Sequence, residues 1–318
     1  MRIAFVGKGG SGKTTISRLY IEYLAHKGEE VLALDADINI HLARKFGVIP
    51  QPERALSYPE NKTRIKQFLL GTNTRIVSTD HMVKTTPPGT GSQCICLSPE
   101  NYFIKHHTQK IHDHVHLGYV GTYEANEIGT SCYHTNLSIA ENVLSHTITK
   151  ANEWMVVDMV AGTDAFSCTL HMQFDAIVLV IEPTPDGVSV AKKYIELAQA
   201  AGVERHLICV GNKCLDKDDE TYLRSEIGDR LITCFMQEPA LRRLEQSGIS
   251  CSYGLFGQEQ SFLEIEIAAK AREWNRQEQL AVLYELHKKY VAQSYIVSEM
   301  GDISGQIDPE FRFGSVHV

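Results

Sequence analysis

The sequence lacks any hydrophobic run long enough to form a membrane-spanning helix. Its apolar stretch Ala176–Ile181 is far shorter than the roughly 20 residues that a span requires. The first residues, Met1–Val6, run directly into glycines and do not show the pattern of a signal peptide. We therefore expect a protein without a membrane span that is located in the cytoplasm.

The sequence also lacks an excess of positive charge and is poor in cysteine. Lysine and arginine number 31 against 39 aspartate and glutamate residues, which gives a formal net charge of −8. Because nucleic acid attracts basic surfaces, general nucleic-acid binding is not expected. Eight cysteines in 318 residues are too few for a disulfide framework and are better interpreted as thiols or metal ligands. Two of them, Cys94 and Cys96, form a C-x-C pair.

Short apolar runs alternate with segments of helical periodicity along most of the chain. Runs that are apolar on both faces are typical of strands buried inside a parallel sheet. The predicted strands are Arg2–Val6, Val31–Leu34, Val115–Val120, Trp154–Val157, Ala176–Ile181 and Leu207–Val210. The predicted helices are Lys13–Lys27, Leu137–Thr149, Gly187–Ala201 and Lys217–Ile227. The alternation predicts an α/β fold: a doubly wound, mostly parallel sheet with helices on both faces, which binds ligands at the carboxyl ends of its strands.

A glycine-rich loop lies between the first predicted strand and the first predicted helix. It fits G-x-x-x-x-G-K-[ST], and a strand before and a helix after are the context that this phosphate-binding motif requires. Backbone N–H groups of such a loop surround phosphates, Lys13 reaches the outer phosphates, and the Thr14 hydroxyl binds magnesium. We therefore expect ATP or ADP with Mg²⁺ as cofactors and slow ATP hydrolysis as the activity. The predicted nucleotide-binding residues of the loop are Gly7, Lys8, Gly9, Gly10, Ser11, Gly12, Lys13, Thr14 and Thr15.

The second lysine of this loop, Lys8, is the mark of the deviant Walker A motif. The chain from Met1 to about Leu255 resembles the MinD, ParA and nitrogenase-iron-protein group of P-loop ATPases. The resemblance implies that Lys8 reaches the nucleotide of a partner subunit, so that ATP closes a homodimer and hydrolysis reopens it. It implies catalytic roles for Lys8, Lys13 and Asp37, with Asp37 orienting or deprotonating the attacking water. Ile38 departs from the proline that commonly follows this aspartate.

The same resemblance places further site residues at later strand ends. Asp158 follows Val156 and Val157 and would hold magnesium together with Thr14, and Gly162 would be a switch glycine. Asn212 and Lys213, after Gly211, resemble the segment whose asparagine amide binds adenine.

The remaining segments divide the chain as follows. Residues 1–255 are expected to form the ATPase domain, with an irregular insertion at about 50–112 that includes loops at Pro50–Pro59 and Lys84–Gly91. Residues 256–318 are expected to form a C-terminal extension: one long helical pattern from Glu259 to Tyr290 and a loosely ordered polar tail.

Three classes of protein share this ATPase fold, and side chains must separate them. An iron–sulfur electron-transfer ATPase needs a thiolate just after the Walker B aspartate, where this chain has Ala161. A MinD- or ParA-like positioning ATPase usually needs a basic face or a C-terminal amphipathic anchor. The third class is a maturation ATPase, and the segments Gly7–Thr15, Asn142–Gly162 and Val180–Pro183 resemble the carbon monoxide dehydrogenase nickel-insertion family of CooC type.

That last resemblance implies a dimer that handles nickel or zinc for a client metalloenzyme. The family carries a C-x-C that completes a four-thiolate site on the dimer axis, and the matching place in this chain is Cys132 with His134. Cys94 and Cys96 form a second pair that could have taken over this role, since thiolate and imidazole both bind zinc or nickel. Both pairs are also consistent with buried or idle side chains. A histidine-rich segment, residues 106–116, is either a metal-loading surface or a polar edge of the sheet.

Overall fold

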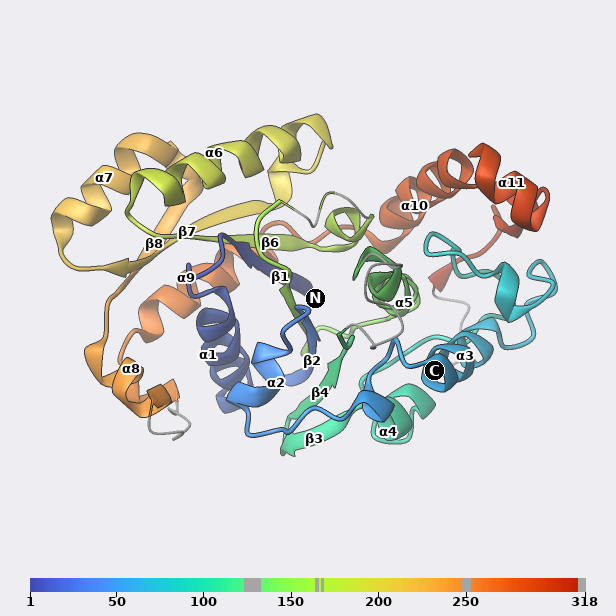
Figure 1. Ribbon diagram of the computed structural model, residues 1–318, viewed down its shortest axis with the longest axis horizontal. Helices are drawn as coiled ribbons and strands as arrows, with labels where there is room; N and C mark the ends of the chain where they lie inside the picture. Colours follow the sequence, from blue (N-terminus) through green and yellow to red (C-terminus); the bar gives the residue numbers. More distant parts are fainter. Residues whose placement is uncertain (123–132, 164–165, 167–168, 247–252, 314–318) are drawn as a thin grey trace.

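The computed structural model of the chain describes residues 1–122, 133–163, 166, 169–246 and 253–313. Its centre is an eight-stranded sheet in the order β3-β4-β2-β5-β1-β6-β7-β8 (Figure 1). All neighbouring strands are parallel except β3 and β4. The strands are β1 (Arg2–Gly7), β2 (Glu30–Ala36), β3 (Gln109–His112), β4 (Val115–Tyr119), β5 (Glu153–Met159), β6 (Ala176–Ile181), β7 (Leu207–Cys214) and β8 (Leu231–Met236). The predicted doubly wound, mostly parallel sheet is confirmed.

Helices cover both faces of the sheet because alternate residues of each buried strand point to opposite sides. On β1, Ala4 and Val6 pack into the core that contains α5, α6 and α7, whereas Ile3 and Phe5 pack into the core that contains α1 and α9. The helices are α1 (Lys13–His26), α2 (His41–Lys45), α3 (Pro59–Leu70), α4 (Tyr102–His107), α5 (Tyr133–Ser145), α6 (Pro185–Ala200), α7 (Lys217–Ile227), α8 (Pro239–Gln246), α9 (Glu259–Lys270), α10 (Arg276–Val291) and α11 (Ser294–Met300). Within the described part of the chain, no helix is long and apolar enough to cross a membrane.

The insertion at about 50–112 contains more regular structure than the sequence analysis expected. It includes α3, α4 and β3, and the expected loop at Pro50–Pro59 ends where Pro59 starts α3. Proline suits the first turn of a helix because its missing N–H would have no partner there, and Ile65 and Leu69 then share the buried face of α3.

The single helical pattern expected from Glu259 to Tyr290 is wrong, because α9 ends at Lys270 and α10 begins at Arg276. The side chain of Asn275 accepts hydrogen bonds from the backbone N–H groups of Gln277 and Glu278, which caps the new helix. No glycine or proline lies between Lys270 and Arg276, so no helix-breaking signal marks this point in the sequence.

The tail after α10 is packed rather than loosely ordered in its described part. Ile303 and Phe311 are buried, and the Asp308 carboxylate accepts a hydrogen bond of 2.9 Å from the backbone N–H of Thr90. Gln306 donates to the carbonyl of His81 at 2.8 Å. In Figure 1 the red α10 and α11 accordingly lie on the same side of the molecule as the blue α3. The tail therefore packs against the insertion and holds it in place through these hydrogen bonds.

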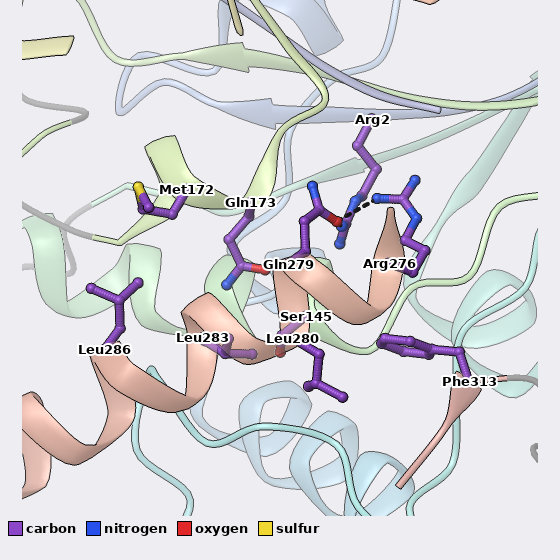
Figure 2. A pocket seen from close by; sticks show the side chains of 10 residues that line it. All are labelled: Arg2, Ser145, Met172, Gln173, Arg276, Gln279, Leu280, Leu283, Leu286 and Phe313. Carbon is purple, nitrogen blue, oxygen red and sulfur yellow. Dashed lines mark hydrogen bonds between the residues drawn. The ribbon is translucent and has the colours of Figure 1, made fainter. Parts of the chain in front are cut away.

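A buried polar network attaches α10 to the amino ends of the strands. Asp175 accepts hydrogen bonds from the backbone N–H of Arg2 at 2.6 Å and of Trp274 at 3.1 Å, and it forms an ion pair with Arg276 at 3.0 Å. Figure 2 shows Arg2, Arg276 and Gln279 converging beside a small cavity that Leu283 and Phe313 close from below. This network lies at the opposite end of the sheet from the phosphate-binding loop.

Candidate nucleotide-binding site

The phosphate-binding loop connects β1 to α1 at the carboxyl edge of the sheet. Gly10 and Gly12 have φ values of +87° and +90°, which other residues rarely adopt. A Cβ atom on Gly12 would lie 2.3 Å from the side-chain nitrogen of Asn212. Glycine is therefore required at residue 12 both by the backbone conformation and by the close approach of β7.

Lys13 lies between two carboxylates that come from different strands. Its Nζ is 2.7 Å from Asp37 and 3.6 Å from Asp158, while the Thr14 hydroxyl donates a hydrogen bond of 2.7 Å to Asp158. Burial alone would lower the pKa of Lys13, but the charges of Asp158 and Asp37 outweigh it and raise that pKa. Burial alone would raise the pKa of Asp37, but Lys13 and Asn39 hold it below its usual range. The structure thus brings together the four residues that the sequence predicts for phosphate, magnesium and water.

Asp158 fits a magnesium site in this structure. One of its carboxylate oxygens is buried without a hydrogen-bond partner, and the other is held by the hydroxyl of Thr14. Burial raises the pKa of Asp158 to about 6, although Lys13 and Thr14 act in the opposite direction. A carboxylate with a spare oxygen beside a hydroxyl is a donor set that Mg²⁺ accepts.

Asp35 is a further buried carboxylate that the sequence analysis did not select. It lies opposite Asp158 in the pairing of β2 with β5 and accepts hydrogen bonds from the backbone N–H of Asp37 at 3.2 Å and of Ala43 at 3.0 Å. Burial and the charge of Asp158 raise the pKa of Asp35 to about 8. Asp35 therefore shapes the loop that presents Asp37 to Lys13. The sequence signal was its place two residues before Asp37.

Lys8 lies at the exposed rim of the loop and is not drawn into the buried cluster. Its Nζ is 3.7 Å from the highly exposed carboxylate of Asp186, and a pair of this kind contributes little to stability. Its side chain can therefore leave Asp186 without much cost.

A cavity of about 430 Å³ opens beside the phosphate-binding loop. The Asn212 side chain donates a hydrogen bond of 2.7 Å to the carbonyl of Ser11, and Lys213 contacts the Gly10 carbonyl and Glu182, each at 2.6 Å. The opposite wall, Met236–Glu238, was missed because β8 was not predicted. The lining residues are Gly12, Thr15, Ile16, Asn212, Lys213, Met236, Gln237, Glu238, Leu241 and Phe256. An apolar cavity with a few polar groups next to a phosphate site has the character of a pocket for a nucleotide base.

Cys94 and Cys96 lie at the opposite end of α5 from His134. Ile95, between Cys94 and Cys96, pairs with Thr147 just after the last turn of α5. The first turns of α5 lie at the other edge of the sheet, where Asn136 donates to the carbonyl of Thr122 beyond β4. Since α5 has 13 residues, about 20 Å separates its ends, far more than the reach of ligands around one metal ion.

Cys94 and Cys96 are both buried, and burial raises the pKa of Cys94 to about 12. Cys132 lies outside the described residues, and His134 is described only as part of α5. Among the residues whose placement is described, no group of three or more His, Cys, Asp or Glu side chains could hold a metal ion.

The histidine-rich segment lies at the β3–β4 edge. His114 contacts Glu30 at 2.8 Å and His116 contacts the Thr108 hydroxyl at 3.1 Å. His107 is buried, and burial lowers its pKa to about 4. His107 belongs to α4, whereas His114 and His116 make polar contacts at the sheet edge.

Comparison with known proteins agrees with this geometry. A family model described as the CobQ/CobB/MinD/ParA nucleotide binding domain matches residues 3–290. The chain is 28% identical to the carbon monoxide dehydrogenase accessory protein CooC of Rhodospirillum rubrum, over 79% of this chain and 89% of that protein. It is 29% identical to an uncharacterized ATP-binding protein of Methanocaldococcus jannaschii, over 72% and 82% of the two chains.

Solved structures share the fold at low sequence identity. A ParA family ATPase from Chlorobium tepidum superposes with a TM-score of 0.57 at 14% identity, covering 84% of this chain and 98% of that one. The cell division ATPase MinD of Pyrococcus furiosus gives 0.52 at 18% identity, covering 85% and 98%.

Proposed function

Because the chain belongs to the CobQ/CobB/MinD/ParA family of nucleotide-binding domains, we propose that it is a slow ATPase whose nucleotide cycle closes and opens a homodimer. The observation that carries the ATPase proposal is the buried cluster of Lys13, Thr14, Asp37 and Asp158 beside the phosphate-binding loop. In this proposal the output of the cycle is the handling of nickel or zinc for a client enzyme in the cytoplasm.

Each residue of the cluster has a distinct role in the proposed reaction. Lys13 exchanges its contact with Asp37 for the outer phosphates, which frees the carboxylate of Asp37 to orient the attacking water and accept its proton. Thr14 and Asp158 would hold Mg²⁺, which neutralises charge on the phosphate oxygens. Lys8 contacts the nucleotide of the partner subunit, and Asn212 with Lys213 lines the base cavity.

Replacement of Lys13 tests the ATPase proposal. The variant Lys13→Ala is expected to lose nucleotide binding, measured by isothermal titration with Mg·ADP, because no other described side chain lies where Lys13 meets both carboxylates. Lys105→Ala, an exposed lysine of α4, is the control and should bind as the native protein does. Unchanged ATP turnover in Lys13→Ala would sink the assignment of the site.

Replacement of Lys8 tests the proposed dimer. Lys8→Ala should still bind nucleotide as a monomer but lose hydrolysis and ATP-driven dimerisation, measured by light scattering with and without Mg·ATP. Its matched control is Asp186→Ala, which removes the surface partner of Lys8 and should leave dimerisation intact. If Lys8→Ala dimerises normally with ATP, the protein is an ordinary monomeric P-loop enzyme.

The metal proposal is supported by the similarity to the CooC accessory protein and by the C-x-H sequence of Cys132 and His134. In the group that the chain resembles, the nucleotide faces the partner subunit. His134, in the first turn of α5, is at the same edge of the sheet as the phosphate-binding loop, whereas Cys94 and Cys96 are at the far edge. We therefore assign the proposed ligands to Cys132 and His134, so that two copies across a two-fold axis supply four.

The metal content of the native protein and of its cysteine variants decides whether Cys132 with His134, or Cys94 with Cys96, binds the metal. The ATP-bound protein should hold about one nickel or zinc per dimer by elemental analysis, and Cys132→Ser should lose it. The double variant Cys94→Ser, Cys96→Ser is the matched control and should keep it. Loss only in the double variant would move the site to the insertion.

The family name also covers MinD and ParA, so a positioning or interaction-switch ATPase is the second candidate. If the native protein takes up neither metal, this candidate predicts ATP-dependent co-sedimentation with lipid vesicles or DNA.

A further inference from the structure

Two cysteines meet beside the base cavity at the carboxyl ends of β7 and β8, two neighbouring strands (Figure 1). Gly211 pairs with Cys234, and Cys214 pairs with Met236. Between these two pairs β7 therefore has one residue more than β8. The extra residue forms a bulge in which Lys213 has a φ of +62°. The bulge turns the side chain of Cys214 to the same side as Cys234.

Gly211 provides the room in which the two thiols meet. A Cβ atom on Gly211 would lie 2.5 Å from the sulfur of Cys234 and 3.3 Å from the sulfur of Cys214, so both sulfur atoms lie over this glycine. The two side chains form a hydrogen bond with each other. Both are free thiols, with Cys214 buried and Cys234 partly exposed.

The two thiols differ in reactivity. The hydrogen bond from Cys214 lowers the pKa of Cys234, whereas the same bond and burial raise the pKa of Cys214. The accessible sulfur is therefore also the one that ionises more readily, as the attacking thiol in disulfide exchange requires.

We propose that Cys214 and Cys234 are a modification site that closes to a disulfide by exchange with a small-molecule disulfide and thereby weakens nucleotide binding. The Cys234 thiolate attacks one sulfur of the oxidant, the oxidant's S–S bond breaks, and one thiolate leaves. Cys214 then gives up its proton and attacks the Cys234 sulfur of the mixed disulfide, and the second thiolate leaves. The two cysteines lose two electrons and two protons, and the oxidant is reduced to two thiols.

The effect on nucleotide rests on the proposed function and follows from the neighbours of the pair. Asn212 and Lys213, on the loop side of the cavity, directly precede Cys214, and Met236 and Gln237 on the opposite wall follow Cys234 closely. The backbone N–H of Gln237 donates to the carbonyl of Cys214 at 2.7 Å, which ties the two walls together. Because bonded sulfur atoms are only about 2.05 Å apart, closure pulls the walls out of register with the phosphate-binding loop.

The test is to incubate the full chain with oxidised glutathione and to map its peptides by mass spectrometry, in parallel with titration of Mg·ADP. We expect a cross-linked Cys214–Cys234 peptide pair and an affinity reduced about tenfold, both reversed by dithiothreitol. Cys234→Ser should form no cross-link and keep its affinity in oxidant. Cys209→Ser, which changes a buried cysteine on the same strand, should still form it.

Absence of the cross-link, or a cross-link that leaves the affinity unchanged, overturns the proposal. If the reduced protein binds no nucleotide at all, the proposed function fails separately, and the peptide map still decides whether the pair closes.

Discussion

At the scale of single residues, Asp35 is a buried carboxylate that we expect to act on the reaction indirectly, by positioning the loop that carries Asp37. Asp35→Ala would leave the backbone N–H groups of Asp37 and Ala43 without their acceptor, which costs about 1–3 kcal/mol for each buried group. We expect the turnover number to fall at least about tenfold while the affinity for Mg·ADP changes less, since Lys13 and Thr14 stay in place. Asp35→Asn keeps one acceptor oxygen and should recover part of the rate. Equal loss of affinity and rate would contradict a positioning role.

A second residue-scale prediction concerns pH. Burial raises the pKa of Glu141 to about 7, although hydrogen bonds from Thr169 act in the opposite direction. A carboxyl group with a raised pKa in the folded state contributes stability below its unfolded pKa of about 4.5 and loses it as pH rises through about 7. Glu141→Gln should therefore become more stable relative to the native protein between pH 5 and pH 8, by about 3 kcal/mol at most. Urea unfolding at several pH values measures this, and Glu204→Gln, an exposed residue, should show no such trend.

The sequence could predict the residues of the site whose chemistry is local. The spacing of glycines, Lys13 and Thr14 defines the phosphate-binding loop by itself, and Asp37 and Asp158 follow apolar runs that end at the same edge of a parallel sheet. Asp35 could not be separated from Asp37 because its role depends on backbone N–H groups of a loop that only the fold brings back to it.

At the scale of elements, Asp175 decides whether α10 stays attached to the sheet. Asp175→Ala would remove the ion-pair partner of Arg276 and the carboxylate whose charge offsets that of the buried Arg2, and loss of one partner of a buried pair costs about 3–5 kcal/mol. We expect a loss of this size in urea unfolding, with nucleotide affinity retained by the folded fraction because the network is at the far edge. Asp302→Ala, an exposed aspartate of the tail, should have little effect. A stable Asp175→Ala protein would mean that apolar contacts of Leu280 and Leu283 suffice to hold α10.

The elements themselves were predictable where burial made their pattern uniform. The six strands expected from apolar runs are all present, because each is covered by helices on both faces. β3 was missed because it is an edge strand whose residues are mostly exposed, so its sequence forms no apolar run. β8 was missed although Leu231–Met236 is an apolar run interrupted only by Thr233, so its sequence did carry the signal of a strand. The missed β8 also hid one wall of the base cavity.

At the scale of the whole molecule, the insertion and the C-terminal tail form one unit that neither segment would form alone. Val83 from the insertion packs with Val291, Ile296 and Ile303 from the C-terminal segment. Such contacts join residues some 200 positions apart, and no local sequence pattern predicts them. The division of the chain into residues 1–255 and 256–318 stays a prediction.

The last prediction concerns the contacts between the C-terminal tail and the insertion. It tests whether loss of the tail affects the insertion at one edge of the sheet without affecting the nucleotide site at the other edge. A chain that ends at Ile303 loses Gln306, Asp308 and Phe311, so the loop at residues 81–92 loses its bonds to the tail. Cys94, directly beyond this loop, should then react faster with iodoacetamide, located by peptide mapping. Mg·ADP affinity should stay within about twofold, because no hydrogen bond or ion pair among the described residues joins the phosphate-binding loop to the tail. The point variant Asp308→Ala should show a smaller increase in the reactivity of Cys94, and Cys209, buried in the sheet, should stay protected in both proteins.

Two outcomes would contradict this prediction. If truncation leaves the protection of Cys94 unchanged, α3 and α5 alone enclose this cysteine. If truncation greatly reduces nucleotide affinity, the tail supports the nucleotide site across the sheet.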